Sequence, residues 1–371
     1  MRRILALILA VAIVLCAFAS CASSKSADTE KKNENKNENV DKKPEENNSD
    51  KVEEIITTEN YTRIGNKITF GTYPQTLVTD KDLENALSAK AGDVPTADDA
   101  KAWKSYGYYV SGSASDYMWY IDVENEGEKY RGVYFNAYRP YSTETTSSQT
   151  NTNQFDNGYL INTVYWFKYE PISWSILRED AQNDTAIIIC DMIIDSQAYQ
   201  NTYLYDSNTY EYYNVLPEVP EKTFANNYAY STVRKWLNET FYNTAFSDLQ
   251  KEIIITTTVD NSVSTTSSTE NNYVCENTED KIFLLSYADI SNGGYGLNSD
   301  NCQKKNTDYA KAQGSCTYLG GSYDGNGWWW LRSPNDYLSY SARVVYSDGK
   351  IYRESVEYVN RGIVPVLQIQ F

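Results

Sequence analysis

Histidine is absent from the sequence of 371 residues. Its absence excludes a Ser-His-Asp triad, a Cys-His nucleophile pair and every metal site that uses imidazole ligands. A lysine or a carboxylate remains available as a general base. The sequence also contains neither a P-loop nor a glycine-rich dinucleotide fingerprint. We therefore predict no metal ion and no cofactor.

Basic side chains are scarce. Lys and Arg number 33 against 50 Asp and Glu, which gives a formal net charge of −17. Nucleic-acid binding is disfavoured, because contacts with phosphates need a basic surface. The same negative charge disfavours docking of the folded part onto anionic lipid. We therefore expect no nucleic acid among the partners.

Cysteine is scarce as well, with six in the chain. Two lie near the N-terminus and four further on: Cys16, Cys21, Cys190, Cys275, Cys302 and Cys316. The spacing of the last four fits no zinc or redox pattern, and four cysteines allow three complete pairings. We predict a Cys302–Cys316 disulfide, since both lie in a polar loop before a tryptophan-rich segment. Cys190 ends an apolar strand and is expected in the core.

The N-terminus has the pattern of an export signal. Met1-Arg2-Arg3 is a short basic region, and residues 4–18 form an apolar run too short to span a bilayer. Small residues precede Cys21, so the segment resembles a bacterial lipoprotein signal, with Phe18 where leucine is usual. The resemblance implies removal of residues 1–20 and a lipid on Cys21. An ordinary cleaved signal and an uncleaved anchor are the alternatives.

Residues 21–60 predict a disordered tether. They are rich in Lys, Glu, Asn and Ser and have almost no apolar residue before Val52. Such a segment cannot bury enough surface to offset its ordering entropy. We expect residues 61–371 to form a single domain in the cell envelope, periplasmic or surface-exposed, which contacts the membrane through the lipid anchor only.

Aromatic residues are abundant, with 34 tyrosines and 8 tryptophans. Tyr and Trp give rigid contact area with a polar handle, which suits the flat faces of sugars. Codon usage in an AT-rich genome would also enrich Tyr, Asn, Lys and Ile, and the sequence leaves both explanations open.

Three consecutive tryptophans form the most unusual stretch, residues 327–334, Gly-Trp-Trp-Trp-Leu-Arg-Ser-Pro. A strand would place Trp328 and Trp330 on one face and Trp329 on the other, and Pro334 would end its ladder. Either both faces are covered by core, or one indole lines an exposed site. Arg332 would then be partly buried and paired, with Asp289, Asp336 or backbone carbonyls of the last strand as partners.

The patterns in the folded part predict an α+β domain, mostly antiparallel β with two or three short helices. Ser231 and Ser247 are expected to cap two helices, with a weaker helical pattern over residues 83–103 and one turn over 286–290. A tyrosine-rich insertion is predicted at about residues 106–160, with strands such as 130–135. The other expected strands are residues 64–70 before a turn at 71–75, then 164–177, 186–194, 253–259, 282–285, 341–346, 351–356 and the C-terminal strand.

Several motifs occur in an order that resembles a bacterial domain-of-unknown-function family, number 6273. They are Phe-Gly-Thr-Tyr-Pro-Gln at 70–75, Glu-Pro-Ile-Ser-Trp at 170–174, residues 231–246, residues 280–286, Trp-Trp-Leu-Arg-Ser-Pro at 329–334 and residues 361–367. The resemblance extends over about residues 64–371. The family's terminal arginine is replaced by Val364, and Arg361 lies three positions earlier. The tryptophan strand and C-terminal hairpin are also similar to C-type-lectin-like domains of the formylglycine-generating type, although no cysteine follows Cys316.

We expect a membrane-anchored lipoprotein whose C-terminal domain binds a glycan or a protein, with no evident catalysis. The alternatives are an enzyme that acts on envelope polymers through carboxylates and a purely structural envelope protein. The candidate ligand contacts are Trp328, Trp330, Tyr337, Tyr340, Arg343 and Tyr346. The candidate structural side chains are Trp174, Trp236, Arg332 and Arg361.

Overall fold

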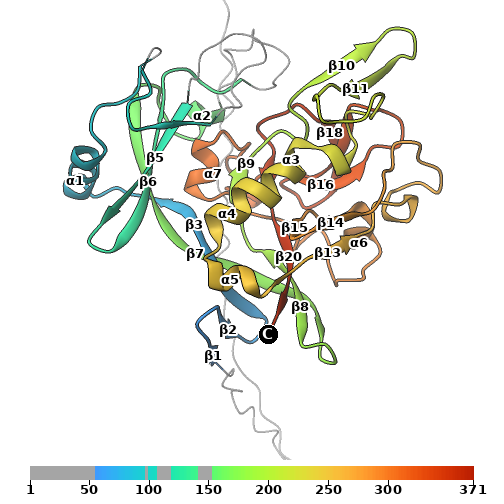
Figure 1. Ribbon diagram of the computed structural model, residues 1–371, viewed down its shortest axis with the longest axis horizontal. Helices are drawn as coiled ribbons and strands as arrows, with labels where there is room; N and C mark the ends of the chain where they lie inside the picture. Colours follow the sequence, from blue (N-terminus) through green and yellow to red (C-terminus); the bar gives the residue numbers. More distant parts are fainter. Residues whose placement is uncertain (1–54, 97–98, 107–117, 141–152) are drawn as a thin grey trace, which may run out of the picture. The chain divides into compact units, whose positions relative to one another are not determined.

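The computed structural model describes residues 55–96, 99–106, 118–140 and 153–371, so the predicted signal peptide, Cys21 and most of the tether lie outside the described residues. Val52–Phe371 form one compact unit (Figure 1). It is an α+β domain of mostly antiparallel strands with short helices, as the sequence predicts. The first strand already lies within the segment assigned to the tether, so the paired chain begins earlier than residue 61.

The larger sheet has eleven strands, with β1-β2-β3-β7-β6-β5-β4 along its main path and β8, β20, β12 and β15 joined to β7 through β8. Its strands are β1 (Ile55–Thr57), β2 (Thr62–Ile64), β3 (Lys67–Leu77), β4 (Lys104–Ser105), β5 (Met118–Asn125), β6 (Glu128–Phe135), β7 (Thr163–Asp180), β8 (Thr185–Cys190), β12 (Ile254–Ile255), β15 (Ile282–Phe283) and β20 (Val366–Gln370).

Strand β7 organises this sheet. Its first third pairs with β6, its middle with β3 and its last third with β8, all antiparallel. The predicted β7–β8 hairpin is therefore confirmed. Within the segment predicted as a tyrosine-rich insertion, β5 and β6 are hydrogen-bonded members of the sheet, and β6 contains the predicted strand at 130–135. Alternation in a tyrosine-rich stretch is masked when tyrosine occupies both faces of a strand.

A second sheet has five strands in the order β18-β17-β16-β19-β9. Only the β16–β19 pair is parallel. Its strands are β9 (Asp195–Ser196), β16 (Trp329–Pro334), β17 (Ser341–Val345), β18 (Ile351–Ser355) and β19 (Gly362–Ile363). Two small hairpins complete the β structure: β10 (Tyr203–Asp206) with β11 (Glu211–Asn214), and β13 (Thr257–Val259) with β14 (Thr278–Asp280).

The helices are short and more numerous than expected. They are α1 (Lys81–Ala91), α2 (Asn153–Asp156), α3 (Thr232–Trp236), α4 (Tyr242–Ala245), α5 (Asp248–Glu252), α6 (Tyr287–Ser291) and α7 (Asp308–Ala312), with single turns η1 (Tyr228–Tyr230), η3 (Val263–Thr265) and η4 (Gly321–Tyr323). The predicted caps are confirmed: Ser231 accepts the N–H of Arg234, and Ser247 forms a capping box with Gln250. A π-helical turn, η2 (Leu237–Phe241), joins α3 to α4.

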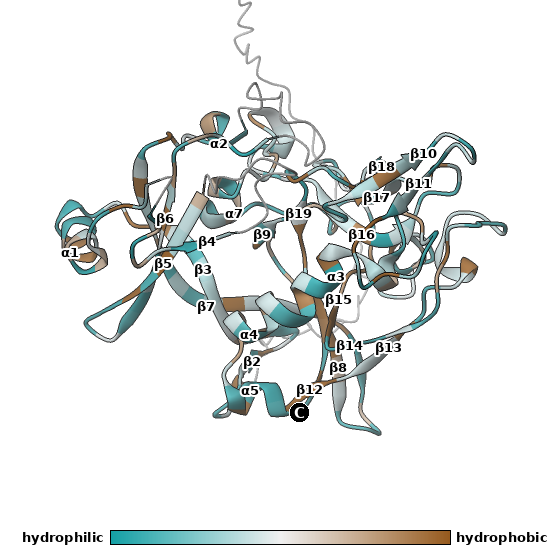
Figure 2. Cartoon of the chain, turned by 45° about the horizontal axis from the view of Figure 1, so that its top comes forward, coloured by the Kyte–Doolittle hydropathy of each residue, from teal (hydrophilic) through white to brown (hydrophobic). Residues whose placement is uncertain are grey.

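The main hydrophobic core lies where the two sheets meet, and Figure 2 shows hydrophobic residues along β8 and β15 there. Trp174 belongs to it, fully buried, with its indole N–H donated to the carbonyl of Phe70 at 2.8 Å. A smaller core that includes Leu87, Trp119 and Trp166 lies between α1 and the β5–β6 strands. No helix among the described residues is long and apolar enough to cross a membrane.

The turn expected at residues 71–75 is wrong, because this segment is part of a strand that bends at Gly71. Strand β3 continues through this segment, with ladder irregularities between Thr69 and Thr72 and again after Pro74. Gly71 has a φ of 72°, and a Cβ there would lie 2.6 Å from the ring of Phe246. A glycine therefore bends the strand and lets α4 approach it.

We expect Gly71→Ala to lower the free energy of unfolding by about 2–3 kcal/mol, because backbone strain at positive φ adds to overpacking. The matched control is Gly92→Ala, since Gly92 has the same φ of 72° with nothing within 4 Å of its Cβ position. Chemical denaturation of both variants measures the difference. Equal losses would show that the contact with Phe246 contributes nothing.

Candidate functional site

The tryptophan-rich strand belongs mainly to the core. Trp329 and Trp330 in β16 are fully buried, and their indole N–H groups donate to the carbonyls of Cys302 at 3.1 Å and Gln197 at 2.9 Å. Both polar handles are therefore satisfied inside the protein. Trp330 cannot contact an external ligand, so its assignment as a ligand-binding candidate is wrong.

Arg332 lies buried at the centre of a hydrogen-bond network. Its Nη1 atom donates to the carbonyl of Leu284 at 2.8 Å and to Oδ2 of Asp289 at 2.7 Å. Its Nε and Nη2 atoms donate to the carbonyl of Asp260 at 3.3 and 3.1 Å. The expected pairing with Asp289 is present, but the carbonyls come from residues outside the last strand. The planar guanidinium thus holds three separate segments together.

Trp328 and Tyr346 form part of a stacked column. Their rings lie 4.0 Å apart and nearly parallel, and Tyr352 follows at 4.3 Å from Tyr346. The guanidinium of Arg361 lies 4.5 Å from the Trp328 ring. Trp328 is half-buried, and its indole N–H has no hydrogen-bond partner among the described residues. The column runs from buried Arg361 to exposed Tyr352 and remains a second candidate surface.

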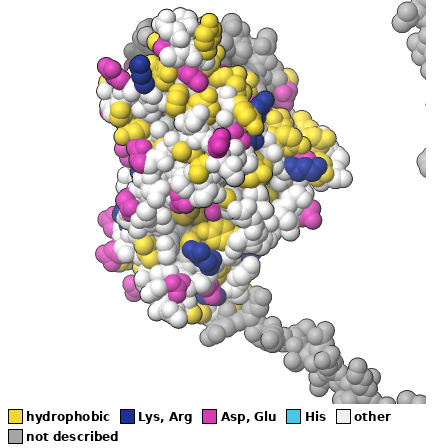
Figure 3. All heavy atoms as spheres, turned by 90° about the vertical axis from the view of Figure 1, so that its right-hand side faces the viewer, with side chains coloured by type: hydrophobic (Ala, Val, Ile, Leu, Met, Phe, Trp, Pro, Cys, Tyr) yellow, Lys and Arg dark blue, Asp and Glu magenta, His cyan; other side chains and the backbone are white. Residues whose placement is uncertain are grey.

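The other candidates from the same region have separate surroundings. Tyr337 is 74% exposed, whereas Tyr340 packs against Tyr212 with ring centroids 4.5 Å apart. Arg343 pairs with Asp336 at 2.9 Å. The first contact joins the β16–β17 connection to β11, and the second joins β17 to that same connection. Figure 3 shows hydrophobic side chains gathered over the upper part of the face that lies on the right of Figure 1.

The predicted Cys302–Cys316 disulfide is wrong. All four described cysteines, Cys190, Cys275, Cys302 and Cys316, are free thiols. The amide of Cys316 donates to Asn360, whereas the amide of Cys302 donates to Asn298. Proximity in sequence did not bring the two side chains together. The described residues also contain no cluster of three or more Cys, Asp or Glu side chains able to hold a metal ion.

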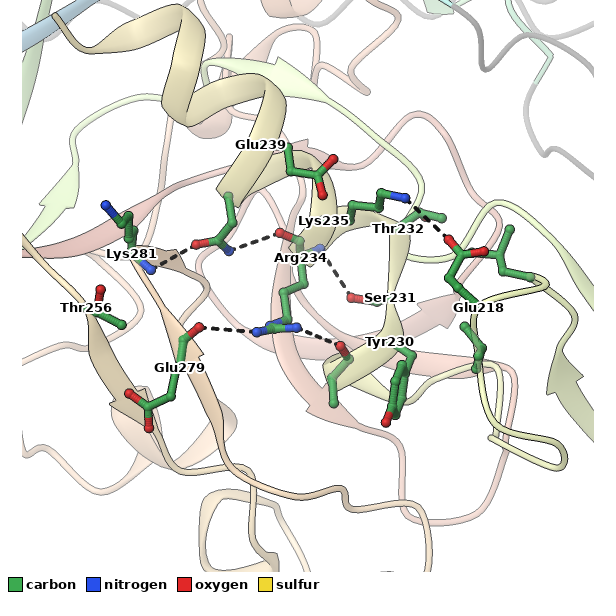
Figure 4. Close-up of a pocket in the computed structure, with 14 residues that line it drawn as sticks. Glu218, Tyr230, Ser231, Thr232, Arg234, Lys235, Glu239, Thr256, Glu279 and Lys281 are labelled. Carbon is green, nitrogen blue, oxygen red and sulfur yellow. Dashed lines mark hydrogen bonds and ion pairs between the residues drawn. The ribbon is translucent and has the colours of Figure 1, made fainter. Parts of the chain in front are cut away.

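A groove of about 530 Å³ lies beside α3 and is lined by charged side chains of both signs (Figure 4). Arg234 pairs with Asp280 at 2.6 Å, and Lys235 pairs with Glu218 at 3.3 Å. The amine of Lys281 donates to the hydroxyl of Tyr242. The basic groups of the groove are thus already paired within the protein, so the groove carries little unused binding capacity.

A smaller pocket of about 260 Å³, the tyrosine pocket, has a different character. One half of its wall comes from the β3–β6 part of the large sheet: Tyr73, Ser105, Tyr106, Tyr120 and Arg131. The other half comes from β9, the α3–η2–α4 helical segment and α7: Asp195, Trp236, Thr240, Thr244 and Tyr309. Figure 1 shows α4 and α7 between the β5–β6 strands and the five-stranded sheet.

Asp195 and Tyr73 form the buried end of the pocket. Asp195 is 2% exposed, and its Oδ2 accepts the Tyr73 hydroxyl at 2.7 Å. Its Oδ1 accepts the Ser196 amide at 2.6 Å and the Gln197 side-chain amide at 3.0 Å. Burial raises the pKa of Asp195, although these hydrogen bonds oppose the rise. Burial and the nearby carboxylate also raise the pKa of Tyr73, so its hydroxyl keeps its proton.

Arg131 forms the charged side of the pocket and pairs with Asp122, which lies outside the pocket lining. Arg131 donates from Nε and Nη2 to the two oxygens of Asp122 at 2.7 and 2.9 Å. Burial acts to raise the pKa of Asp122, but the hydrogen bonds and charge of Arg131 outweigh it and the pKa is lowered. The guanidinium also lies 4.3 Å from the ring centroid of Tyr120. This bidentate pair fixes a cation between aromatic rings.

Trp236 provides a partly exposed indole in this pocket. The sequence pattern placed it on the apolar face of a helix with Phe241, and the two rings do stack at 5.7 Å. However, Trp236 is only half-buried and lines the cavity. The following π-helical turn η2 contributes Thr240 to the same wall, and such turns are frequent at functional sites. The structural assignment of Trp236 is therefore incomplete.

The family model for the Domain of unknown function (DUF6273) matches residues 183–371, which is 189 of the 371 residues. The chain belongs to the DUF6273 family. Searches of curated proteins and of solved structures yield no match. The match begins later than the expected residue 64, so the motifs at 70–75 and 170–174 lie outside it.

The DUF6273 region supplies only one half of the tyrosine pocket. Asp195, Trp236 and Tyr309 lie within it, whereas Tyr73 and Arg131 lie before it. The hydrogen bond from Tyr73 to Asp195 therefore joins the preceding strands to the family domain. At the C-terminus of the family domain, Val364 and Arg361 are both fully buried, so Arg361 makes structural contacts rather than surface ones.

Proposed function

We propose that this DUF6273 protein is an exported, membrane-tethered lipoprotein whose folded domain binds a ligand in the tyrosine pocket. Export and tethering are supported by the N-terminal signal pattern, Cys21 and the polar segment that follows. Ligand binding is supported by one observation above all. Tyr73, Arg131 and Asp195 are more than nine-tenths buried, yet they line a cavity that opens beside half-buried Trp236.

Several properties favour binding over hydrolysis. Asp195 is the one carboxylate among the described residues that line the pocket, and its oxygens accept three hydrogen bonds from the protein. Glycoside hydrolysis usually uses two carboxyl groups that flank the bond. An enzyme that acts on envelope polymers and a purely structural protein remain the alternatives. The expected C-type-lectin-like relationship fits a binding role and is part of the proposal.

The proposed anchor predicts that the mature protein begins at Cys21 with a lipid on its sulfur. Mass spectrometry of the N-terminal peptide of the native protein measures this directly. Cys21→Ser is expected to leave the precursor uncleaved or to release the protein from the membrane fraction. An unmodified N-terminal peptide that starts at another residue would exclude the anchor.

Two tryptophan variants distinguish the tyrosine pocket from the stacked column. We expect Trp236→Ala to weaken binding of purified envelope polysaccharide to the full-length protein at least tenfold, because an aromatic wall of the pocket is lost. Trp328→Ala should leave this affinity within twofold. Surface plasmon resonance on immobilised polysaccharide measures both. Loss of binding in Trp328→Ala alone would show that the polysaccharide binds at the stacked column of Trp328, Tyr346 and Tyr352.

A further inference from the structure

We propose that the tyrosine pocket accepts a single neutral pyranose ring, such as the terminal residue of a glycan. This inference rests on the proposed binding function and specifies its ligand. The cavity of about 260 Å³ is smaller than the ~300–1,000 Å³ typical of pockets for drug-sized ligands. A pocket of this size holds one ring and leaves the remainder of a chain outside. The pocket therefore recognises the end of a glycan chain and not an internal stretch of the polymer.

The aromatic walls match the apolar faces of a pyranose. Trp236 comes from the helical part of the wall, and Tyr106 and Tyr120 come from the sheet part, with their ring centroids 4.8 Å apart. Rigid aromatic rings provide contact area with little loss of side-chain entropy. The C–H groups on one face of a sugar ring are apolar and flat enough to pack against such rings.

The pocket is unsuited to a cationic ligand, although aromatic cages often bind ammonium groups. Its own cation already occupies the aromatic faces: the guanidinium of Arg131 lies 4.3 Å from the centroid of Tyr120 and 6.0 Å from that of Tyr309. A second cation would lose these faces and be repelled by Arg131. Choline-like and amino-sugar ligands are therefore disfavoured.

The pocket is equally unsuited to an anionic ligand. Asp122 accepts from the Nε and Nη2 atoms of Arg131 and balances its charge, so the guanidinium offers little net positive charge to a ligand carboxylate. Asp195 lies at the buried end, where its oxygens already accept three hydrogen bonds and offer an anionic group no donor. Arg131, the cation of the wall, is neutralised by Asp122 behind it, which leaves a neutral ligand as the best match.

Two hydroxyl groups in the wall of the tyrosine pocket favour a ligand with several O–H donors. The Tyr73 hydroxyl donates its proton to Asp195, and the Thr244 hydroxyl donates its proton to the carbonyl of Thr240 at 2.7 Å. Each oxygen therefore presents lone pairs and no hydrogen to the cavity. A polyol supplies the missing donors, whereas an aromatic or aliphatic ligand would leave both oxygens unpaired at a cost.

The experiment is a ligand-observed saturation-transfer NMR titration of the full-length protein with defined probes. The neutral probes are the methyl pyranosides of glucose, galactose and mannose, and N-acetylglucosamine. The charged probes are glucuronate, glucosamine and choline, and tyrosine amide is the aromatic probe. We expect at least one neutral pyranoside to bind and Trp236→Ala to weaken it at least tenfold.

A matched pair of threonine variants tests the hydroxyl argument. Thr244→Val should weaken the neutral pyranoside roughly threefold to tenfold, because one hydrogen bond to the ligand is lost. Thr223→Val is the control, since the Thr223 hydroxyl likewise donates to a backbone carbonyl but lies outside the pocket. Both residues are half-buried, so their folding costs should be similar.

The outcomes separate the inference from the proposed function. Binding of a charged or aromatic probe through Trp236, with every neutral pyranoside silent, would overturn the inference and leave the binding function intact. Silence of all probes would overturn both. Neutral binding that is insensitive to Trp236→Ala and Thr244→Val would place the sugar elsewhere on the protein and also overturn the inference.

Discussion

Replacement of Arg332 by alanine should lower the free energy of unfolding by about 2–4 kcal/mol. The reason is the loss of a buried guanidinium that donates to Leu284, Asp260 and Asp289. Without it, two carbonyls and one carboxylate lose their donor in a region with little access to water. The melting temperature should fall by about 3–6 °C for a domain of this size.

Arg332→Lys should also be destabilising, because an ammonium group cannot reproduce the planar fork that reaches three segments. The control is Arg353→Ala on the neighbouring strand β18, where the arginine side chain is exposed. Thermal unfolding followed by circular dichroism measures all three variants. Unchanged melting of both Arg332 variants would show that the buried network is dispensable and that the residue is free for binding.

Replacement of Asp122, the ion-pair partner of Arg131, should also lower the free energy of unfolding. Here the cause is the loss of a counter-charge and not the loss of a hydrogen-bond donor. Asp122→Asn leaves a buried guanidinium, 7% exposed, without its counter-charge. Such a loss typically costs about 3–5 kcal/mol, and we expect about 3 kcal/mol because the Asp122 side chain is 29% exposed. The control is Glu128→Gln, which breaks the exposed pair with Lys168 on adjoining strands and should cost under about 1 kcal/mol.

The difference in stability between wild type and Asp122→Asn should depend on pH, in the direction set by the lowered pKa of Asp122. The folded-state pKa lies below the ordinary value of 3.8, so the carboxylate contributes stability above that value and loses it as the pH falls through the folded pKa. The difference between wild type and Asp122→Asn should be full at pH 7 and shrink below about pH 4. Urea titrations at several pH values measure it. A difference that stays constant down to pH 2 would contradict the proposed ion pair.

Local patterns in the sequence predicted much of the fold. The β7–β8 and β17–β18 hairpins and the caps Ser231 and Ser247 depend on neighbours close in the chain, and the structure contains them. The burial of Arg332 beside Asp289 followed from the cost of an unpaired charge. The predictions of hairpins and caps succeed because alternation, turn residues and capping are short-range properties.

The tyrosine pocket could not be predicted in the same way. Its wall draws on residues from Tyr73 to Tyr309, and the key contact joins Tyr73 to Asp195 across 122 positions of sequence. Trp236 occupies a regular helical position, and only the position of β5 and β6 in the sheet shows that its indole faces a cavity. The excess of tyrosine in the sequence was the available signal for such a pocket. It does not indicate which of the rings lie close together in the fold.

A crystal structure of the protein soaked with a methyl pyranoside would locate the ligand in the tyrosine pocket or elsewhere. We expect density for one sugar ring in the tyrosine pocket, packed against Trp236, with a sugar hydroxyl donated to Oη of Tyr73. Thr244 should accept a second sugar hydroxyl. Density for the sugar against Tyr352 at the end of the stacked column, with the tyrosine pocket holding solvent alone, would show that the tyrosine pocket is not the sugar site.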